Sequence, residues 1–141
     1  MIAYLDTSAI IPLLIEEPAS ETCTALWDAA ADVVCSRIGY VEAAAALAQA
    51  ARLGRVTDDQ QDQSLTLLDH FWDEVTVLPV DEPLVRRAAA LAREHSLRGY
   101  DAVHCAAALV IADPDLVVAS GDRDLLAAWE TEGLQVVDTH S

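Results

Sequence analysis

Apolar and polar residues follow two periods along this chain, and segments of the two kinds alternate from one end to the other. Short apolar runs rich in Val and Ile indicate buried strands. The five predicted strands are Ile2–Leu5, Val33–Cys35, Val75–Val80, Leu116–Ala119 and Gln135–Val137. The segments with helical spacing follow Asp6-Thr7-Ser8 as far as Pro18 and then cover Ala19–Ala31, Ile38–Arg52, Asp58–Trp72, Asp81–His95, Tyr100–Ala112 and Asp122–Glu132. This alternation predicts an α/β fold whose parallel sheet of about five strands carries helices on both faces.

Capping residues mark several of the helix ends. Ser36 is expected to cap the helix that begins near Ile38, and Gly54 and Gly133 are expected to end helices. The chain has 141 residues and contains no linker or low-complexity segment. We therefore expect residues 1–141 to form one domain with a sizeable core.

Charge restricts the classes of function. The formal net charge is −16, and all eight basic residues are arginines. Such acidity argues against a non-specific nucleic-acid coat, which needs a basic surface. If the substrate is a nucleic acid, another cation must neutralise its phosphates.

The three cysteines and the hydropathy pattern indicate the compartment. Cys23, Cys35 and Cys105 are odd in number and form no C-x-x-C pair, so we expect buried thiols rather than a disulfide framework or a zinc knuckle. The apolar stretch Ala9–Ile15 is short, contains Pro12 and lacks a basic leader, which argues against a signal peptide. No apolar run is long enough to cross a membrane, so we expect a cytoplasmic protein without membrane contact.

Acidic residues follow the strands that should share one edge of the sheet. Asp6 comes directly after the first strand, and Asp122 and Asp124 come after the fourth. In sheets of this kind ligands bind outside the carboxyl ends of the strands. Asp101 begins a later helix, and Glu42 is the one charged residue between Ile38 and Ala51.

Each of these acids has a purely structural alternative. Asp6 and Asp122 could be helix N-caps, Asp101 could complement a helix dipole in the first turn, and Glu42 could be a solvated helix residue. Glu42 departs most from that alternative, because a lone carboxylate in a helix of small, closely packing residues should have a partner.

If the carboxylates converge, they require a cation. Two like charges about 4 Å apart repel by about 4 kcal/mol at an effective dielectric constant near 20. Oxygen ligands of this kind suit Mg²⁺ or Mn²⁺. Such a site can activate water and neutralise a phosphodiester, which would also supply the positive charge that the protein lacks.

At these residues the chain resembles the PIN-domain nucleases, specifically the VapC ribonuclease toxins of bacterial toxin–antitoxin pairs. The resemblance covers essentially the whole chain. It rests on four segments in the family's order and spacing: Leu5-Asp6-Thr7-Ser8, Val41-Glu42, Tyr100-Asp101-Ala102-Val103-His104 and Ser120-Gly121-Asp122-Arg123-Asp124-Leu125.

The resemblance implies a Rossmann-like, three-layer PIN domain and a metal-dependent endoribonuclease that cleaves RNA. It implies metal ligation by Asp6, Glu42, Asp101 and Asp122, with Asp124 as a possible further ligand. It also implies that Thr7 and Ser120 orient carboxylates or water, that the protein forms a homodimer, and that a cognate antitoxin inhibits it.

Other side chains have weaker claims to function. For His104, one turn after Asp101, a hydrogen-bonded helix histidine is favoured over a base or metal ligand. Arg98 and Arg123 flank the acidic residues and could contact phosphate or pair with nearby acids. The three tryptophans, Trp27, Trp72 and Trp129, are expected to pack in the core or at a dimer interface rather than stack on bases.

Two other classes of function stay open at this point. An aspartyl-phosphate hydrolase would use Asp6 as the nucleophile, but the sequence lacks the second aspartate of the D-x-D-x-T motif and has no lysine to hold a phosphate. A catalytically inactive binding module would use the acids as helix caps.

Overall fold

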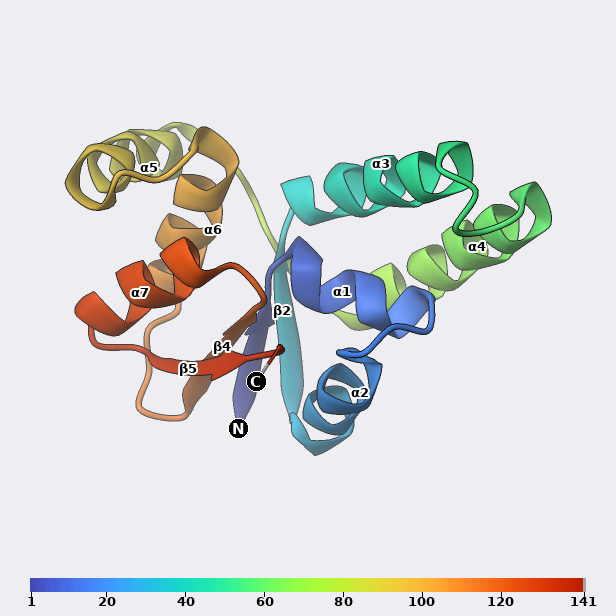
Figure 1. Cartoon of the computed structure of the whole chain (residues 1–141). Coiled ribbons are helices and arrows are strands. Elements are labelled where there is room, and N and C mark those ends of the chain that lie inside the picture. Colours follow the sequence, from blue (N-terminus) through green and yellow to red (C-terminus); the bar gives the residue numbers. More distant parts are fainter. Residues whose placement is uncertain (141) are drawn as a thin grey trace.

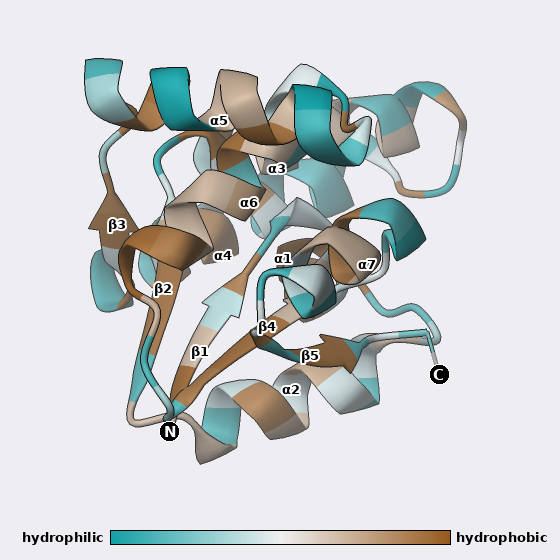
Figure 2. Cartoon of the chain, turned by 90° about the vertical axis from the view of Figure 1, so that its left-hand side faces the viewer, coloured by the Kyte–Doolittle hydropathy of each residue, from teal (hydrophilic) through white to brown (hydrophobic). Residues whose placement is uncertain are grey.

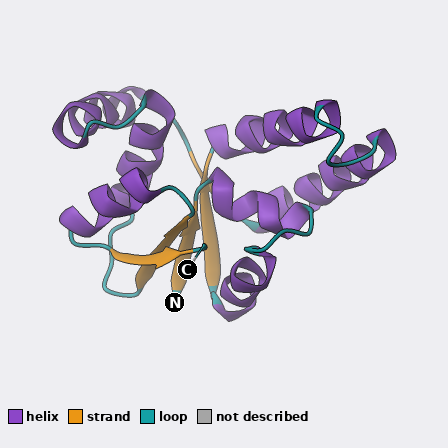
Figure 3. Cartoon of the chain, in the orientation of Figure 1, coloured by secondary structure: helices purple, strands orange, loops and turns teal. Residues whose placement is uncertain are grey.

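The computed structural model describes residues 1–140, and its centre is one parallel sheet. The five strands, β1 to β5 in chain order, are Ile2–Leu5, Asp32–Ser36, Thr76–Leu78, Leu116–Ser120 and Gln135–Asp138. Their order across the sheet is β3-β2-β1-β4-β5, and every neighbouring pair is parallel. β1 therefore lies at the middle, between β2 and β4, and the predicted α/β architecture is confirmed (Figures 1 and 3).

The helices cover the sheet in two groups. The seven helices, α1 to α7, are Thr7–Leu14, Ser20–Ala29, Ile38–Arg52, Asp58–Glu74, Glu82–His95, Gly99–Val110 and Arg123–Thr131. Helices α1 to α4 lie on one side of the strands, and α5 to α7 lie on the other (Figure 1). Among the described residues no helix is both long and apolar enough to span a membrane.

The pleat of β1 and its neighbours divides the core into two halves. Tyr4 and Val34 pack with α5, α6 and α7, whereas Ala3, Leu5 and Cys35 pack with α1 to α4. Successive strand residues point to opposite faces, so strands buried on both faces are apolar throughout. Figure 2 shows brown, apolar colouring over much of β2 and β4, whereas the arrowhead of β1 is pale. The three cysteines are free and buried, as expected.

Several element ends differ from the prediction. The first helix ends at Leu14 rather than near Pro18, and β3 covers three residues rather than the predicted Val75–Val80. Ser36 is the last residue of β2 and does not cap α3, whose N-cap is Arg37 without a side-chain hydrogen bond. Gly54 and Gly133 do follow helix ends, with φ of 73° and 89°, a conformation that glycine adopts without steric cost.

Candidate active site

Asp6 leaves the central strand and serves as the N-cap of α1. Its Oδ1 accepts hydrogen bonds from the backbone N–H of Ala9 (3.2 Å) and the hydroxyl of Ser8 (2.7 Å), and its Oδ2 accepts one from the hydroxyl of Ser120 (2.6 Å). The residue is only 4% exposed. Burial raises the pKa of Asp6 above its usual value, against the opposing effect of His104 and of the hydrogen-bond donors.

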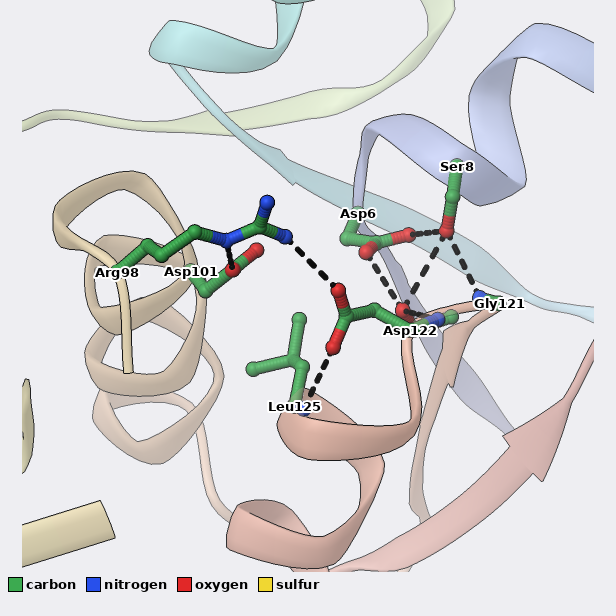
Figure 4. A network of polar contacts seen from close by, with 8 residues as sticks. Asp6, Ser8, Arg98, Asp101, Gly121, Asp122 and Leu125 are labelled. Carbon is green, nitrogen blue, oxygen red and sulfur yellow. Dashed lines mark hydrogen bonds and ion pairs between the residues drawn. The ribbon is translucent and has the colours of Figure 1, made fainter. Parts of the chain in front are cut away.

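Asp122 occupies the equivalent position after the neighbouring strand β4. Its Oδ1 accepts from the backbone N–H of Leu125 (3.0 Å) and so caps α7. The backbone N–H of Asp122 donates to Ser120 Oγ (2.9 Å), and the N–H of Gly121 donates to Ser8 Oγ (2.8 Å). Two serine hydroxyls therefore join the ends of β1 and β4 and hold Asp6 beside Asp122 (Figure 4).

Glu42 faces the same edge of the sheet from the first turns of α3. Its Oε1 accepts hydrogen bonds from the hydroxyl of Thr7 (2.8 Å) and from Nε2 of His104 (2.7 Å). The side chain of Glu42 is 23% exposed, so it is partnered but still reaches solvent. His104 is hydrogen-bonded, as the sequence favoured.

Asp101 comes from the first turn of α6, and it is paired with Arg98. The guanidinium of Arg98 donates to Asp101 Oδ2 (3.0 Å) and to Asp122 Oδ2 (3.1 Å), and it lies 4.8 Å from the centroid of the Tyr100 ring. Figure 4 shows Arg98 reaching from α6 across to Asp122. Burial raises the pKa of Asp101, the nearby Asp122 raises it further, and Arg98 lowers it.

These four acids line one cleft of about 700 Å³. The remaining residues of its wall are Thr7, Ser8, Ile11, Ala45, Ala46, Gln49, Arg52, Arg98, Tyr100 and His104. Asp124 and Arg123 are exposed in the first turn of α7 and do not line the cleft. Ser120 lies beneath it, fully buried.

The structural and functional explanations of the acids are compatible. Asp6 and Asp122 are N-caps, and Asp101 does lie in the first turn of a helix. A carboxylate has two oxygens, however, and capping by Asp122 uses only Oδ1, while Oδ2 faces Arg98. The capping alternative therefore does not exclude a role in the cleft.

Sequence reasoning missed three features of the site and its surroundings. The sequence does not mark Ser8 or the cleft residue Arg52 as site residues. His95, for which the sequence suggested no role, contacts Glu132 at 3.2 Å and Glu94 at 4.0 Å. Only the Ser8 hydroxyl, two positions after Asp6, could have been suspected from the sequence, because the other contacts depend on tertiary packing.

The tryptophans pack against other aromatic rings, with Trp129 buried and Trp27 and Trp72 half-buried. Trp129 is fully buried with its ring centroid 5.8 Å from that of Tyr4, and Trp27 lies 4.7 Å from Phe71 in the same measure. Trp72 contacts Tyr40 at 5.5 Å between ring centroids. None of the three lines the acidic cleft, which agrees with the predicted packing role.

The residues of the cleft fit a hard divalent cation. All four charged ligand candidates offer carboxylate oxygens, the donors that Mg²⁺ and Mn²⁺ prefer. A cation already lies between two of them, because the Arg98 guanidinium bridges Asp101 and Asp122. Asp101 and Asp122 are therefore close enough for one positively charged group to contact both.

Comparison with known proteins decides the family. A family model described as "PIN domain" matches residues 3–129. The chain is also 38% identical over 135 residues to ribonucleases VapC45 and VapC49 of Mycobacterium tuberculosis, covering 96% of this chain and 94% of each relative. The chain belongs to the PIN-domain family. Within that family it is similar to the VapC nucleases, as the sequence motifs indicated.

Solved structures support the same PIN fold. The crystal structure of PAE2754 from Pyrobaculum aerophilum superposes with a TM-score of 0.70 at 26% identity, covering 99% of this chain and 85% of that one. A chain from a toxin–antitoxin complex of Klebsiella pneumoniae gives a TM-score of 0.65 at 20% identity and covers 97% of both chains. The PIN assignment removes the aspartyl-phosphate hydrolase as a competing interpretation.

Proposed function

We propose that this PIN domain, spanning residues 1–141, is an endoribonuclease that depends on Mg²⁺ or Mn²⁺ and acts as the toxin of a toxin–antitoxin pair in the cytoplasm. The observation that carries the proposal is the convergence of Asp6, Glu42, Asp101 and Asp122 on one cleft. These acids come from four different elements, and they are separated by up to 116 positions in the chain. The 38% identical relatives named ribonucleases support RNA as the substrate.

The four acids would hold the metal, which when bound supplies Lewis acidity and an activated water for phosphodiester hydrolysis. Asp6 and Asp101 are the principal ligands in this proposal. Thr7 and Ser120 would act as orienting residues, because their hydroxyls already donate to Glu42 Oε1 and Asp6 Oδ2. Asp124 stays a weaker candidate ligand, since it lies outside the cleft.

An acidic protein needs local positive charge to hold RNA, and the cleft has two arginines. Arg98 lies on one wall, 63% exposed in its side chain, and Arg52 lies on α3 at the opposite wall. Arg98 can release its carboxylates to the metal and turn to a phosphate, since guanidinium binds both groups in the same geometry. Arg123, the other predicted phosphate contact, does not line the cleft and has less support.

Two purified variants test the catalytic assignment. Asp6→Asn and Asp101→Asn preserve size and remove charge, and Asn caps a helix about as well as Asp does. We expect each variant to keep its fold by circular dichroism and to lose RNA cleavage by at least about 100-fold, the scale seen when an essential electrostatic group is removed. Asp28→Asn, an exposed residue of α2, is the matched control and should cleave normally. Undiminished cleavage by both Asp6→Asn and Asp101→Asn would refute the assignment and favour an inactive binding module.

The negative charge of the cleft and the shape of the groove beside it suggest how an antitoxin would bind. A second groove of about 780 Å³, between α1, α3 and α4, adjoins the acidic cleft and shares Ile11, Ala46 and Gln49 with it. An antitoxin segment could pack apolar residues there and place an arginine among the acids, where its fork would pair with carboxylates. The similar fold solved within a toxin–antitoxin complex supports a partner of this kind.

Inhibition measured against Mg²⁺ and salt distinguishes two ways of binding that partner. An inserted arginine competes with metal, so inhibition should relax as Mg²⁺ rises and weaken with salt. Inhibition indifferent to both would indicate remote apolar packing instead. Homodimer formation, the remaining proposal, is checked by sedimentation of the purified chain.

A further inference from the structure

A chain of hydrogen bonds runs from the centre of the sheet to the acidic cleft. The hydroxyl of Tyr4 lies 2.7 Å from His104 Nδ1, and His104 Nε2 lies 2.7 Å from Glu42 Oε1. Tyr4 is fully buried and His104 is 2% exposed. Residues of β1, α6 and α3 are thus joined in one line.

The direction of each hydrogen bond follows from the carboxylate at its end. A carboxylate oxygen only accepts, so the hydrogen shared between His104 and Glu42 lies on Nε2, and Nδ1 of the neutral ring is then the acceptor for the Tyr4 hydroxyl. A protonated Nδ1 would leave the buried Tyr4 hydroxyl without an acceptor, which costs about 1–3 kcal/mol. His104 is therefore the tautomer with hydrogen on Nε2, and it donates to Glu42.

Glu42, at the end of this series of hydrogen bonds, indicates what the series does. Both the His104 ring and the Thr7 hydroxyl donate to the same atom of Glu42, Oε1. Two donors on one oxygen fix the carboxylate plane and leave Oε2 for another partner. Outer-sphere hydrogen bonds of this kind orient metal-binding carboxylates and tune their affinity.

We propose that Tyr4 and His104 are positioning residues of this nuclease: through the Nε2–H tautomer of His104 they fix Glu42 so that its Oε2 faces the cleft for the metal ion. The proposal rests on the proposed function, in which Glu42 is a metal ligand. His104 is not assigned as a base, since its two ring nitrogens are hydrogen-bonded to Tyr4 and Glu42 and the residue is only 2% exposed.

Nuclear magnetic resonance tests the tautomer without any assay of activity. Long-range ¹H–¹⁵N correlation spectra of the histidine-labelled chain report which ring nitrogen carries hydrogen, and the spectrum of His104→Gln assigns the His104 signals among the four histidines. We expect the Nε2–H tautomer in the wild type, and a change in this pattern in Tyr4→Phe. An Nδ1–H tautomer or a doubly protonated ring at neutral pH would contradict the proposed hydrogen bonds from Tyr4 to His104 and from His104 to Glu42.

Mn²⁺ binding, measured by calorimetry, tests the positioning role. His104→Leu removes the donor to Glu42 and should weaken binding by about 10- to 100-fold, the usual effect of losing an outer-sphere partner. His104→Gln places an amide N–H near the position of Nε2 and should restore most of the affinity. Tyr4→Phe should fall between them, and kcat should drop in these variants more than KM for RNA changes.

A matched control and the opposing results complete the experiment. Tyr40→Phe removes another hydroxyl bonded to a carboxylate, that of Asp69, outside the cleft, and should bind Mn²⁺ normally. If His104→Leu folds and binds Mn²⁺ like the wild type, Glu42 does not depend on His104 and the proposal fails. If His104→Leu does not fold, Mn²⁺ binding by Tyr4→Phe and the tautomer spectrum of the wild type test the proposal instead. A wild type that binds no Mn²⁺ would contradict the proposed metal site. The hydrogen bonds from Tyr4 through His104 to Glu42 would still be tested by the tautomer spectrum.

Discussion

The hydroxyl of Ser120 donates a 2.6 Å hydrogen bond to Oδ2 of Asp6, across a separation of 114 positions in the chain. Both residues are buried, and the same hydroxyl accepts the backbone N–H of Asp122 at 2.9 Å. One side chain at the end of β4 thus controls the position of two acids at the carboxyl edge of the sheet.

Replacing Ser120 should damage both stability and cleavage. Ser120→Ala leaves the buried Asp6 oxygen and the N–H of Asp122 without a partner, so we expect the free energy of unfolding to fall by about 1–3 kcal/mol. Chemical denaturation measures this loss, and RNA cleavage should fall as well. Ser64→Ala is the control, because Ser64 is also buried and hydrogen-bonded, to the carbonyl of Leu14, but it contacts none of the four acids. Equal losses of activity in both variants would mean that Ser120 matters only for packing.

Divalent metal should stabilise the folded state. Binding to the native protein alone raises stability by mass action, by about 2.7 kcal/mol when the metal is at 100 times its Kd. We expect Mg²⁺ or Mn²⁺ to raise the melting temperature, and EDTA to reverse the effect. Asp101→Asn should abolish the rise, because one ligand and one charge are lost. A melting temperature of the wild type that ignores millimolar metal at neutral pH would contradict the proposed site.

Arg98 should compete with metal for Asp101 and Asp122. Since its guanidinium bridges both carboxylates, Arg98→Gln should tighten Mn²⁺ binding several-fold and should raise KM for RNA, because a phosphate contact is lost. Calorimetry and steady-state kinetics measure the two effects separately. Arg86→Gln removes an exposed arginine paired with Glu82 on α5 and should change neither quantity. Weaker metal binding in Arg98→Gln would show that Arg98 supports the metal site instead.

Stability should decline in alkaline solution because of two buried thiols. Burial raises the pKa of Cys35 and of Cys105 from 9.0 to about 12. Between these values the native state keeps its protons while the unfolded state loses them, so the stabilisation present below pH 9 is lost as the pH rises towards 12. Denaturation measured from pH 8 upward should show this slope, and Cys35→Ala or Cys105→Ala should make it shallower. Rapid labelling of native Cys105 by a thiol reagent at pH 8 would contradict its burial.

The order of elements could be predicted from the sequence because burial on both faces gives β1, β2 and β4 a strong apolar signal. The end of α1 could not, since Pro18 lies beyond the actual stop at Leu14, and the helix ends where Ser20 binds the carbonyls of Pro12 and Ile15. That contact spans only eight and five positions, but the apolar periodicity of the segment does not reveal it. Position after a strand likewise indicated Asp6 and Asp122, whereas Asp124 in the same motif is exposed and does not line the cleft.

The hydrogen-bond partners of the site's acids were also not predictable from the sequence. Its acids were recognisable because a lone charge in an apolar or Ala-rich segment is conspicuous. The partners that orient them, Ser8 and His104, come from helices whose packing fixes their direction, and no spacing rule in the sequence connects His104 to Tyr4, 100 positions away. Hydrogen-bond networks that cross the core are therefore the part of a site that only the structure provides.

The central place of β1 governs when this nuclease can first act during its synthesis. β1 is made first, but it pairs with β4, in a register that joins Ile2 to Leu116, and the cleft needs Asp122 beyond that strand. A nascent chain on the ribosome therefore carries an incomplete sheet and an incomplete set of acids until Asp122 has been translated. Under the proposed function, products truncated before Asp122 would be unable to cleave RNA, and an antitoxin would have time to meet the chain before the cleft is complete.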